Sequence, residues 1–103
     1  MSIKKQYLKS EPVCKLSFRV SKEQVDSADS VKIVGEFNDW SMDVEPMKKL
    51  KSGDFTQTLK LETEKEYQFK YVVNDSVWIN DEEADKMVPN GITEGEFNSA
   101  LVL

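Results

Sequence analysis

Two tryptophans stand beside polar loop residues, where an indole ring can stack on a flat ligand. Trp40 follows the segment 35–39 at the end of a strand-like stretch, and Trp78 follows a turn at residues 74–77. An indole face offers a large apolar platform, and polar neighbours can bond hydroxyl groups, so this pairing suits a sugar ring. The alternative from residue type alone is that each ring covers one end of a hydrophobic core.

A lysine in the most strongly patterned segment adds a possible hydrogen-bond donor. In the run 67–73, apolar residues at every second position alternate with Gln68, Lys70 and Val72. Successive side chains of a strand point to opposite faces, so Lys70 is predicted to point away from the core. Its ammonium either donates to ligand oxygens or is simply solvated at the sheet surface.

The sequence excludes several kinds of catalytic and metal chemistry. It contains no histidine, which removes the Ser-His-Asp and Cys-His mechanisms and the usual general base near neutral pH. The single cysteine, Cys14, excludes an internal disulfide, and its place on an inward strand face is that of a buried hydrophobe. The acidic run at 80–85 lacks the spacing of an EF-hand loop, so we expect no bound metal and no cofactor.

Length and charge place further limits on the class of protein. The chain has 103 residues, 39% of them hydrophobic, which fits one domain with one modest core. The 14 basic and 19 acidic residues give a net charge of −5, which argues against a nucleic-acid partner. The first 22 residues are basic, and we interpret this start as a solvated, lysine-bearing edge strand. No apolar run is long enough for a membrane span, and no secretory signal is evident, so we expect a cytoplasmic protein.

Period-two alternation of apolar residues predicts the fold. Short strands are expected at residues 13–20, 31–37, 55–61, 67–73, 77–79 and 99–103. Helix signals are slight, with capping-box spacing at 21–24 and 80–83 that precedes only a turn or two. About seven short strands at this spacing indicate an all-β, immunoglobulin-like antiparallel β-sandwich. We divide the chain into a basic extension at 1–12 and a sandwich module at 13–103.

The segment 31–40, VKIVGEFNDW, resembles the G-x-F-N-x-W signature of the glycogen- and starch-binding modules of carbohydrate-binding family 48. This module is the "early set" domain of isoamylases and branching enzymes, and it occurs in the β subunit of AMP-activated protein kinase. The segment 66–73, EYQFKYVV, is similar to the family's Y-x-Y-K-F-x-V strand, and 95–98, GEFN, is similar to its closing loop. The order and spacing hold from about residue 13 onward, and the whole chain looks like small free-standing bacterial proteins of this type.

The resemblance implies a non-catalytic binding site for α-1,4-glucan. The family's two stacking tryptophans fall on Trp40 and Trp78, its sugar-bonding lysine falls on Lys70, and its terminal asparagine falls on Asn98. Glu96 stands in the final loop and would accept bonds from sugar hydroxyls. The implied ligand is glycogen, starch or a maltooligosaccharide.

The chain departs from the family pattern at two places. The turn at 74–77 is about one residue longer than the family's turn, which would displace Trp78. Two positions of the final loop that help to hold glucan in the kinase-subunit version are Glu94 and Glu96 here. One possibility is that these carboxylates accept hydrogen bonds from two adjacent sugar hydroxyls. The other is that the site no longer binds sugar well, because burying an uncompensated charge is costly.

The departures leave two further functions open. One is a protein-interaction module that docks onto a glucan-metabolising enzyme. The other is a small glycoside hydrolase, for which a chain of this size offers little room for a deep cleft.

Overall fold

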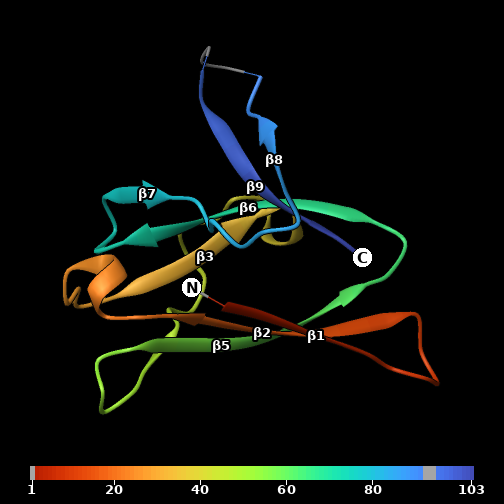
Figure 1. Ribbon diagram of the computed structural model, residues 1–103, viewed down its shortest axis with the longest axis horizontal. Coiled ribbons are helices and arrows are strands. Elements are labelled where there is room, and N and C mark those ends of the chain that lie inside the picture. The colour runs from red at the N-terminus through yellow and green to blue at the C-terminus, as the bar shows by residue number, and fades with distance from the viewer. Residues whose placement is uncertain (1, 92–94) are drawn as a thin grey trace.

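Two antiparallel β-sheets pack face to face across residues 2–91 and 95–103, which the computed structural model describes (Figure 1). The four-stranded sheet has the order β1 (Ser2–Tyr7), β2 (Val13–Val20), β5 (Phe55–Glu62) and β4 (Lys48–Lys49). The five-stranded sheet has the order β3 (Val31–Gly35), β6 (Glu66–Val73), β9 (Phe97–Val102) and β8 (Lys86–Pro89), with β7 (Val77–Ile79) also paired to β6. The predicted antiparallel β-sandwich is therefore confirmed.

The core lies between the sheets and is built from the predicted alternate positions. On β2, the inward side chains are Cys14, Leu16, Phe18 and Val20, and all four are fully buried. The Phe69 ring of β6 stands edge-on to Phe18, at 5.8 Å between ring centroids. This arrangement explains why the patterned segments 13–20 and 67–73 form the central strands, since each gives an apolar face to the same core.

The described residues form nine strands, against about seven expected. The excess comes from β4 and β8. The basic start forms the expected edge strand, β1, which pairs along its whole length with β2, from Ser2 opposite Arg19 to Tyr7 opposite Cys14. One inward position of β1 is Lys5, which breaks the apolar alternation. Its ammonium reaches across to the Asp85 carboxylate at 2.5 Å. The boundary that we placed at residue 13 stays a prediction.

The two capping-box spacings in the sequence correspond to short turns in the structure. The first capping spacing produces a single 3-10 turn, η1 (Glu23–Val25), with the Ser21 amide donating to the Gln24 side chain at 3.2 Å. The second spacing, at 80–83, gives only turns. A further 3-10 turn, η2 (Glu36–Asn38), ends β3 earlier than the expected residue 37. Among the described residues, no helix has the length and apolar character needed to cross a membrane.

A buried polar network fixes the segment between β7 and β8 to the five-stranded sheet. The Tyr71 hydroxyl donates to Asp81 Oδ2 at 2.7 Å, and both residues are fully buried. The Asp81 amide donates to the hydroxyl of Ser99 on β9, and that hydroxyl donates to the Phe69 carbonyl at 2.6 Å. Burial first, and then the neighbouring Asp81 carboxylate, raise the pKa of Tyr71 far above its ordinary value. The network therefore holds β6, β9 and the segment after β7 in one arrangement.

Candidate functional site

The loop that carries Trp40 begins at a glycine for which no other residue is suited. A Cβ atom on Gly35 would press against the Gln68 carbonyl oxygen and lie 2.8 Å from Phe69 Cβ. The Gly35 amide donates to Asn38 Oδ1 at 3.0 Å, and Asn38 Nδ2 donates to the Ile33 carbonyl at 3.0 Å. The Trp40 amide then donates to the Gly35 carbonyl at 2.9 Å. The glycine and asparagine of the G-x-F-N-x-W motif thus shape the turn that presents the tryptophan.

Two consecutive residues at the tip of this loop have a strained backbone. Asp39 and Trp40 both have φ of 56°, in the left-handed region that bulky residues rarely adopt. A non-glycine residue held in this region costs on the order of 1 to 3 kcal/mol, and such residues cluster at binding and catalytic sites. The loop therefore holds Trp40 in a backbone conformation that a tryptophan rarely adopts.

Trp78 lies on the outer face of the five-stranded sheet, directly opposite Val72 of β6. A three-residue turn at 74–76 connects Val73 to its partner Val77, with Asn74 and Asp75 both in the left-handed conformation. Asn74 Oδ1 accepts the amides of two residues that precede β3, at 2.8 and 3.1 Å, so the turn is anchored. The longer turn preserves the parity that places Trp78 on the outer face.

The outward side chains of β6 and β9 form the floor between the two tryptophans. Phe69 and Tyr71 point into the core, so Gln68 and Lys70 point outward from the same strand. On β9, Asn98 Nδ2 donates to Gln68 Oε1 at 2.9 Å. The Gln68 backbone amide donates to Glu36 Oε1 at 2.6 Å, which ties the Trp40 loop to this floor.

The Lys70 ammonium is available to a ligand. Across residues 2–91 and 95–103, it makes no hydrogen bond and no ion pair, and its neighbour across the ladder is the apolar Val34. Both indole N–H groups, of Trp40 and Trp78, likewise have no acceptor in this part of the chain. The floor and its edges therefore present three unused donors.

The β8–β9 hairpin supplies the far side of the site. The Asn90 amide donates to the Glu96 carbonyl at 3.0 Å, and Asn90 Nδ2 lies 3.5 Å from Glu96 Oε2. The Glu96 side chain is exposed, so its carboxylate stays hydrated. Glu94, the other acid expected in this loop, lies outside the described residues.

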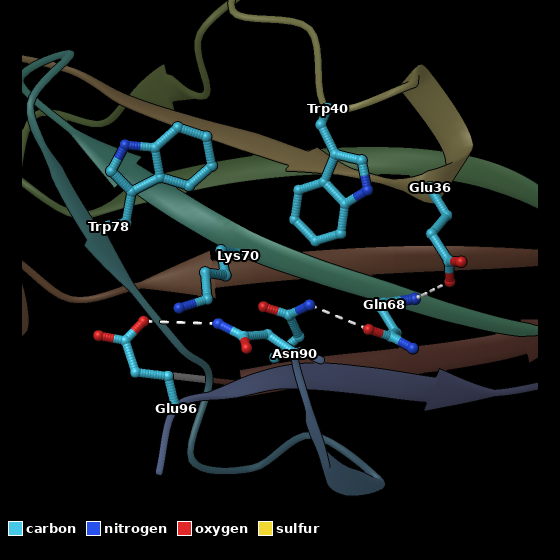
Figure 2. Close-up of a pocket in the computed structure, with 8 residues that line it drawn as sticks. Glu36, Trp40, Gln68, Lys70, Trp78, Asn90 and Glu96 are labelled. Atoms are coloured by element: carbon cyan, nitrogen blue, oxygen red, sulfur yellow. Dashed lines mark hydrogen bonds between the residues drawn. The ribbon is translucent and has the colours of Figure 1, made fainter. Parts of the chain in front are cut away.

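All of these side chains line one open groove of about 720 Å³ on the outer face of the five-stranded sheet. Its lining consists of Glu36, Trp40, Gln68, Lys70, Trp78, Asn90, Glu96 and Asn98. Figure 2 shows the two indole rings along one side of the groove, with Lys70, Asn90 and Glu96 below them in the view. The volume falls within the range of about 300 to 1,000 Å³ that is typical of small-molecule sites.

The structure brings together every site residue that we expected from the sequence within its described part. Trp40, Lys70, Trp78, Glu96 and Asn98 all line the groove. Neither tryptophan belongs to the core cluster or to the partly buried hydrophobic residues packed against it in the described chain, and Trp78 is 44% exposed. This placement disfavours the interpretation of either ring as a cover over the end of the core.

Three further lining residues were missed. Gln68 shares the outward parity of Lys70, and this signal was enough to find it. Glu36 lies inside the G-x-F-N-x-W motif, but the 3-10 turn that directs it toward the groove follows from the close approach at Gly35. Asn90 has no local signal, because its position depends on the pairing of β8 with β9.

The groove offers hydrogen-bond donors, hydrogen-bond acceptors and apolar ring faces. No group of three or more His, Cys, Asp or Glu side chains is arranged to hold a metal ion among residues 2–91 and 95–103. Cys14 is a free thiol buried in the core, away from the groove. Chemically, this arrangement suits a ligand with flat apolar faces and a rim of hydroxyl groups.

Comparison with known families identifies the module. A family model described as the glycogen recognition site of AMP-activated protein kinase matches residues 23–98. No curated protein matches the sequence. The matched stretch contains all eight residues that line the groove, from Glu36 to Asn98. Because the match covers most of the chain, the chain belongs to the family of this glycogen recognition site.

Proposed function

We propose that the chain binds α-1,4-linked glucan, as glycogen, starch or a maltooligosaccharide, and performs no chemistry on it. The observation that carries this proposal is the convergence of two indole rings, one half-buried (Trp40) and one exposed (Trp78), and an unpaired lysine on one open groove. The family match supports glycogen recognition in general. The choice of α-1,4-glucan rests on the resemblance of the motifs.

In this proposal, the aromatic rings supply most of the affinity. Trp40 and Trp78 stack on the apolar faces of glucose rings, because an indole face is broad and costs little conformational entropy when it binds. Lys70 and the amide of Asn98 bond sugar hydroxyls along the floor. A shallow site of this kind binds weakly, and a millimolar Kd corresponds to only about −4 kcal/mol.

The carboxylates of the groove act as hydrogen-bond acceptors. Glu36 and Glu96 are both exposed, so a sugar hydroxyl can bond either one without moving its charge into an apolar environment. A glycosidase acid requires burial that keeps it protonated near neutral pH, and an open groove does not provide this. We therefore favour binding over hydrolysis, and the absence of reducing-sugar release from maltoheptaose is the expected result.

Native affinity electrophoresis in glycogen-containing gels tests the site. Trp40→Ala and Trp78→Ala should each weaken retardation, because truncating a central aromatic contact typically costs about 2 kcal/mol or more. Tyr7→Ala is the matched control, since Tyr7 is also an exposed aromatic residue (54%) but lies on the other sheet. If both tryptophan variants migrate as the parent does, the proposed site is wrong.

An amide-shift NMR titration with maltoheptaose locates the contact independently. The expected shifts involve the two indole N–H signals and the amides of Lys70 and Asn98. Lys70→Met keeps the aliphatic stem and removes the ammonium, so it should weaken binding without changing the fold. A cytoplasmic location and a glucan-metabolising enzyme as partner stay predictions.

A further inference from the structure

The outer face of the four-stranded sheet carries a cluster of positive charge that the groove does not use. Alternation along β1, β2, β5 and β4 turns five cations to this surface, which we call the cationic face: Lys4, Lys15, Arg19, Lys48 and Lys60. Their neighbours on the same face are mainly hydroxyl-bearing side chains: Ser2, Ser17, Thr56 and Thr58. This cluster is unexpected in a chain whose net charge is −5.

The acids near the cationic face are few and already bonded. Asp54 accepts from Arg19 Nη2 at 2.9 Å, and this hydrogen bond, with that from the Lys22 amide, lowers the pKa of Asp54. Glu62, at the end of β5, is paired with Lys65 at 2.5 Å. In the part of the chain that the structure describes, the other four cations of the face have no ion pair.

Two of these lysines are direct cross-strand neighbours. Lys15 of β2 stands opposite Lys60 of β5 in the ladder. Like charges directly opposite in an antiparallel pair are destabilising, since their Cβ atoms lie about 5 Å apart. The sheet therefore holds an unfavourable pair that an anionic partner would relieve.

A shallow depression of about 180 Å³ lies on the cationic face between Lys4 and Arg19. Ser2 and Ser17 also line it, and neither hydroxyl has a hydrogen-bond partner in the described chain. Thr56 is not an available donor, because its hydroxyl donates to the Phe18 carbonyl at 3.1 Å. The guanidinium of Arg19 is 53% exposed and keeps further N–H groups beyond the one bonded to Asp54. Two cations and two hydroxyls around a small depression suit a single carboxylate.

We propose that the cationic face docks an acidic protein surface, with one carboxylate of the partner in the depression between Lys4 and Arg19. The lysines around it, Lys15, Lys48 and Lys60, face further acids of the same partner. A protein fits better than a nucleic acid, because the outward positions of β1, β2 and β5 hold no aromatic residue on which bases can stack. A membrane surface fits less well, because the face offers no large apolar side chain for insertion.

The cationic face and the groove lie on opposite outer surfaces of the sandwich, so both can be occupied at once. The shortest dimension of the molecule is 24 Å, whereas the Debye length at physiological salt is about 8 Å. An acidic partner at the cationic face is therefore screened from the acids around the groove. Docking at the cationic face does not require glucan binding, so it can occur even if the groove binds no ligand.

An amide-shift titration with a poly-glutamate peptide tests the cationic face. We expect saturable shifts at Lys4, Ser17 and Arg19, and none at the indole signals. Reversing both cross-strand lysines (Lys15→Glu with Lys60→Glu) should weaken binding about tenfold, because it replaces two exposed attractive charge pairs by repulsive ones. The matched control reverses two exposed lysines outside the strands, Lys9→Glu with Lys51→Glu, and should bind as the parent does.

A second pair of variants tests the depression itself. Lys4→Met and Lys48→Met each remove one cation from the same face, but only Lys4 lines the depression. Lys4→Met should weaken peptide binding more; equal effects would overturn the assignment of a carboxylate to the depression.

Three other outcomes would overturn the docking proposal. The first is equal weakening by the Lys9/Lys51 control, which would reduce the effect to overall charge. The second is tighter binding of polyphosphate, duplex DNA or phosphatidylserine vesicles than of the peptide at the same salt concentration, which would indicate a phosphate-bearing partner. The third is displacement of the peptide by maltoheptaose, which would contradict two independent faces.

Discussion

Replacing Tyr71 by phenylalanine removes the hydroxyl that donates to the buried Asp81 carboxylate. The two atoms are 2.7 Å apart, and both residues have no exposed surface. The other oxygen of the carboxylate keeps the Glu83 amide at 2.8 Å, but in the described chain Oδ2 loses its donor. The ring and its packing stay unchanged, so the substitution isolates a single hydrogen bond.

The expected loss of stability follows from the charge on the acceptor. A hydrogen bond to a charged group contributes about 1.5 to 3 kcal/mol, and a buried acceptor left without a donor adds a desolvation penalty. We therefore expect Tyr71→Phe to lower the free energy of unfolding by about 2 to 3 kcal/mol. For a domain near 100 residues, this corresponds to a fall in Tm of roughly 10 to 20 °C.

Urea unfolding of the parent and two variants measures this cost. The matched control is Tyr67→Phe, which removes the same hydroxyl from the same strand, where it donates to the Glu62 carbonyl at an exposed site. The control should change the free energy of unfolding by less than about 0.5 kcal/mol. A Tyr71→Phe cost below about 1 kcal/mol, or one equal to that of Tyr67→Phe, would refute the role assigned to the buried network.

Three further predictions concern the pH dependence of Tyr71, the close approach at Gly35 and the thiol of Cys14. Because the folded pKa of Tyr71 is raised above its ordinary value of 10.0, its stabilising contribution is complete below pH 10. Above that pH it is lost, at about 1.4 kcal/mol per pH unit, and urea titrations at alkaline pH should show this loss in the parent but not in Tyr71→Phe. Gly35→Ala should lower the free energy of unfolding by about 1 to 3 kcal/mol, because the added Cβ overpacks the site. It should also weaken glycogen retardation, since it displaces the loop that carries Trp40. A Gly35→Ala variant as stable as the parent would contradict the close approach at Gly35. Cys14 should react with a thiol reagent only after denaturation, and rapid reaction of the folded protein would show that the thiol is not buried.

The central strands were predictable because their alternation is local and nearly complete. Residues 13–20 and 67–73 place mainly apolar side chains at their inward positions, and both form strands at the centre of the sandwich. The same alternation correctly predicted that the Lys70 side chain points outward. The alternation predicts which side chains point inward, because one face of the strand packs on the core whichever strands are its neighbours.

Other features depend on a pairing partner that the local sequence pattern does not indicate. The inward Lys5 of β1 contradicts the alternation, and its position is compatible with the sandwich only because Asp85 pairs with it across 80 residues. Asp81 likewise lies in an acidic run that has no local reason to be buried, yet Tyr71 supplies a buried donor. Trp78 lies on the outer face because it stands opposite Val72 in the ladder of β6 with β7, and whether the longer turn displaces it from the family's position stays a prediction. In all three cases a pairing partner, and not the local sequence pattern alone, sets the position of the residue.

The groove is lined by residues that are far apart in the sequence. Its lining extends from Glu36 after β3 to Asn98 on β9, and β6 pairs with both of these distant strands. Such non-local pairing is typical of sandwiches that fold in milliseconds to seconds, more slowly than helical proteins of similar size. During synthesis, the groove cannot form before residue 98 has left the ribosome. A chain truncated before Asn98 therefore lacks part of the surface that a ligand of the groove would contact.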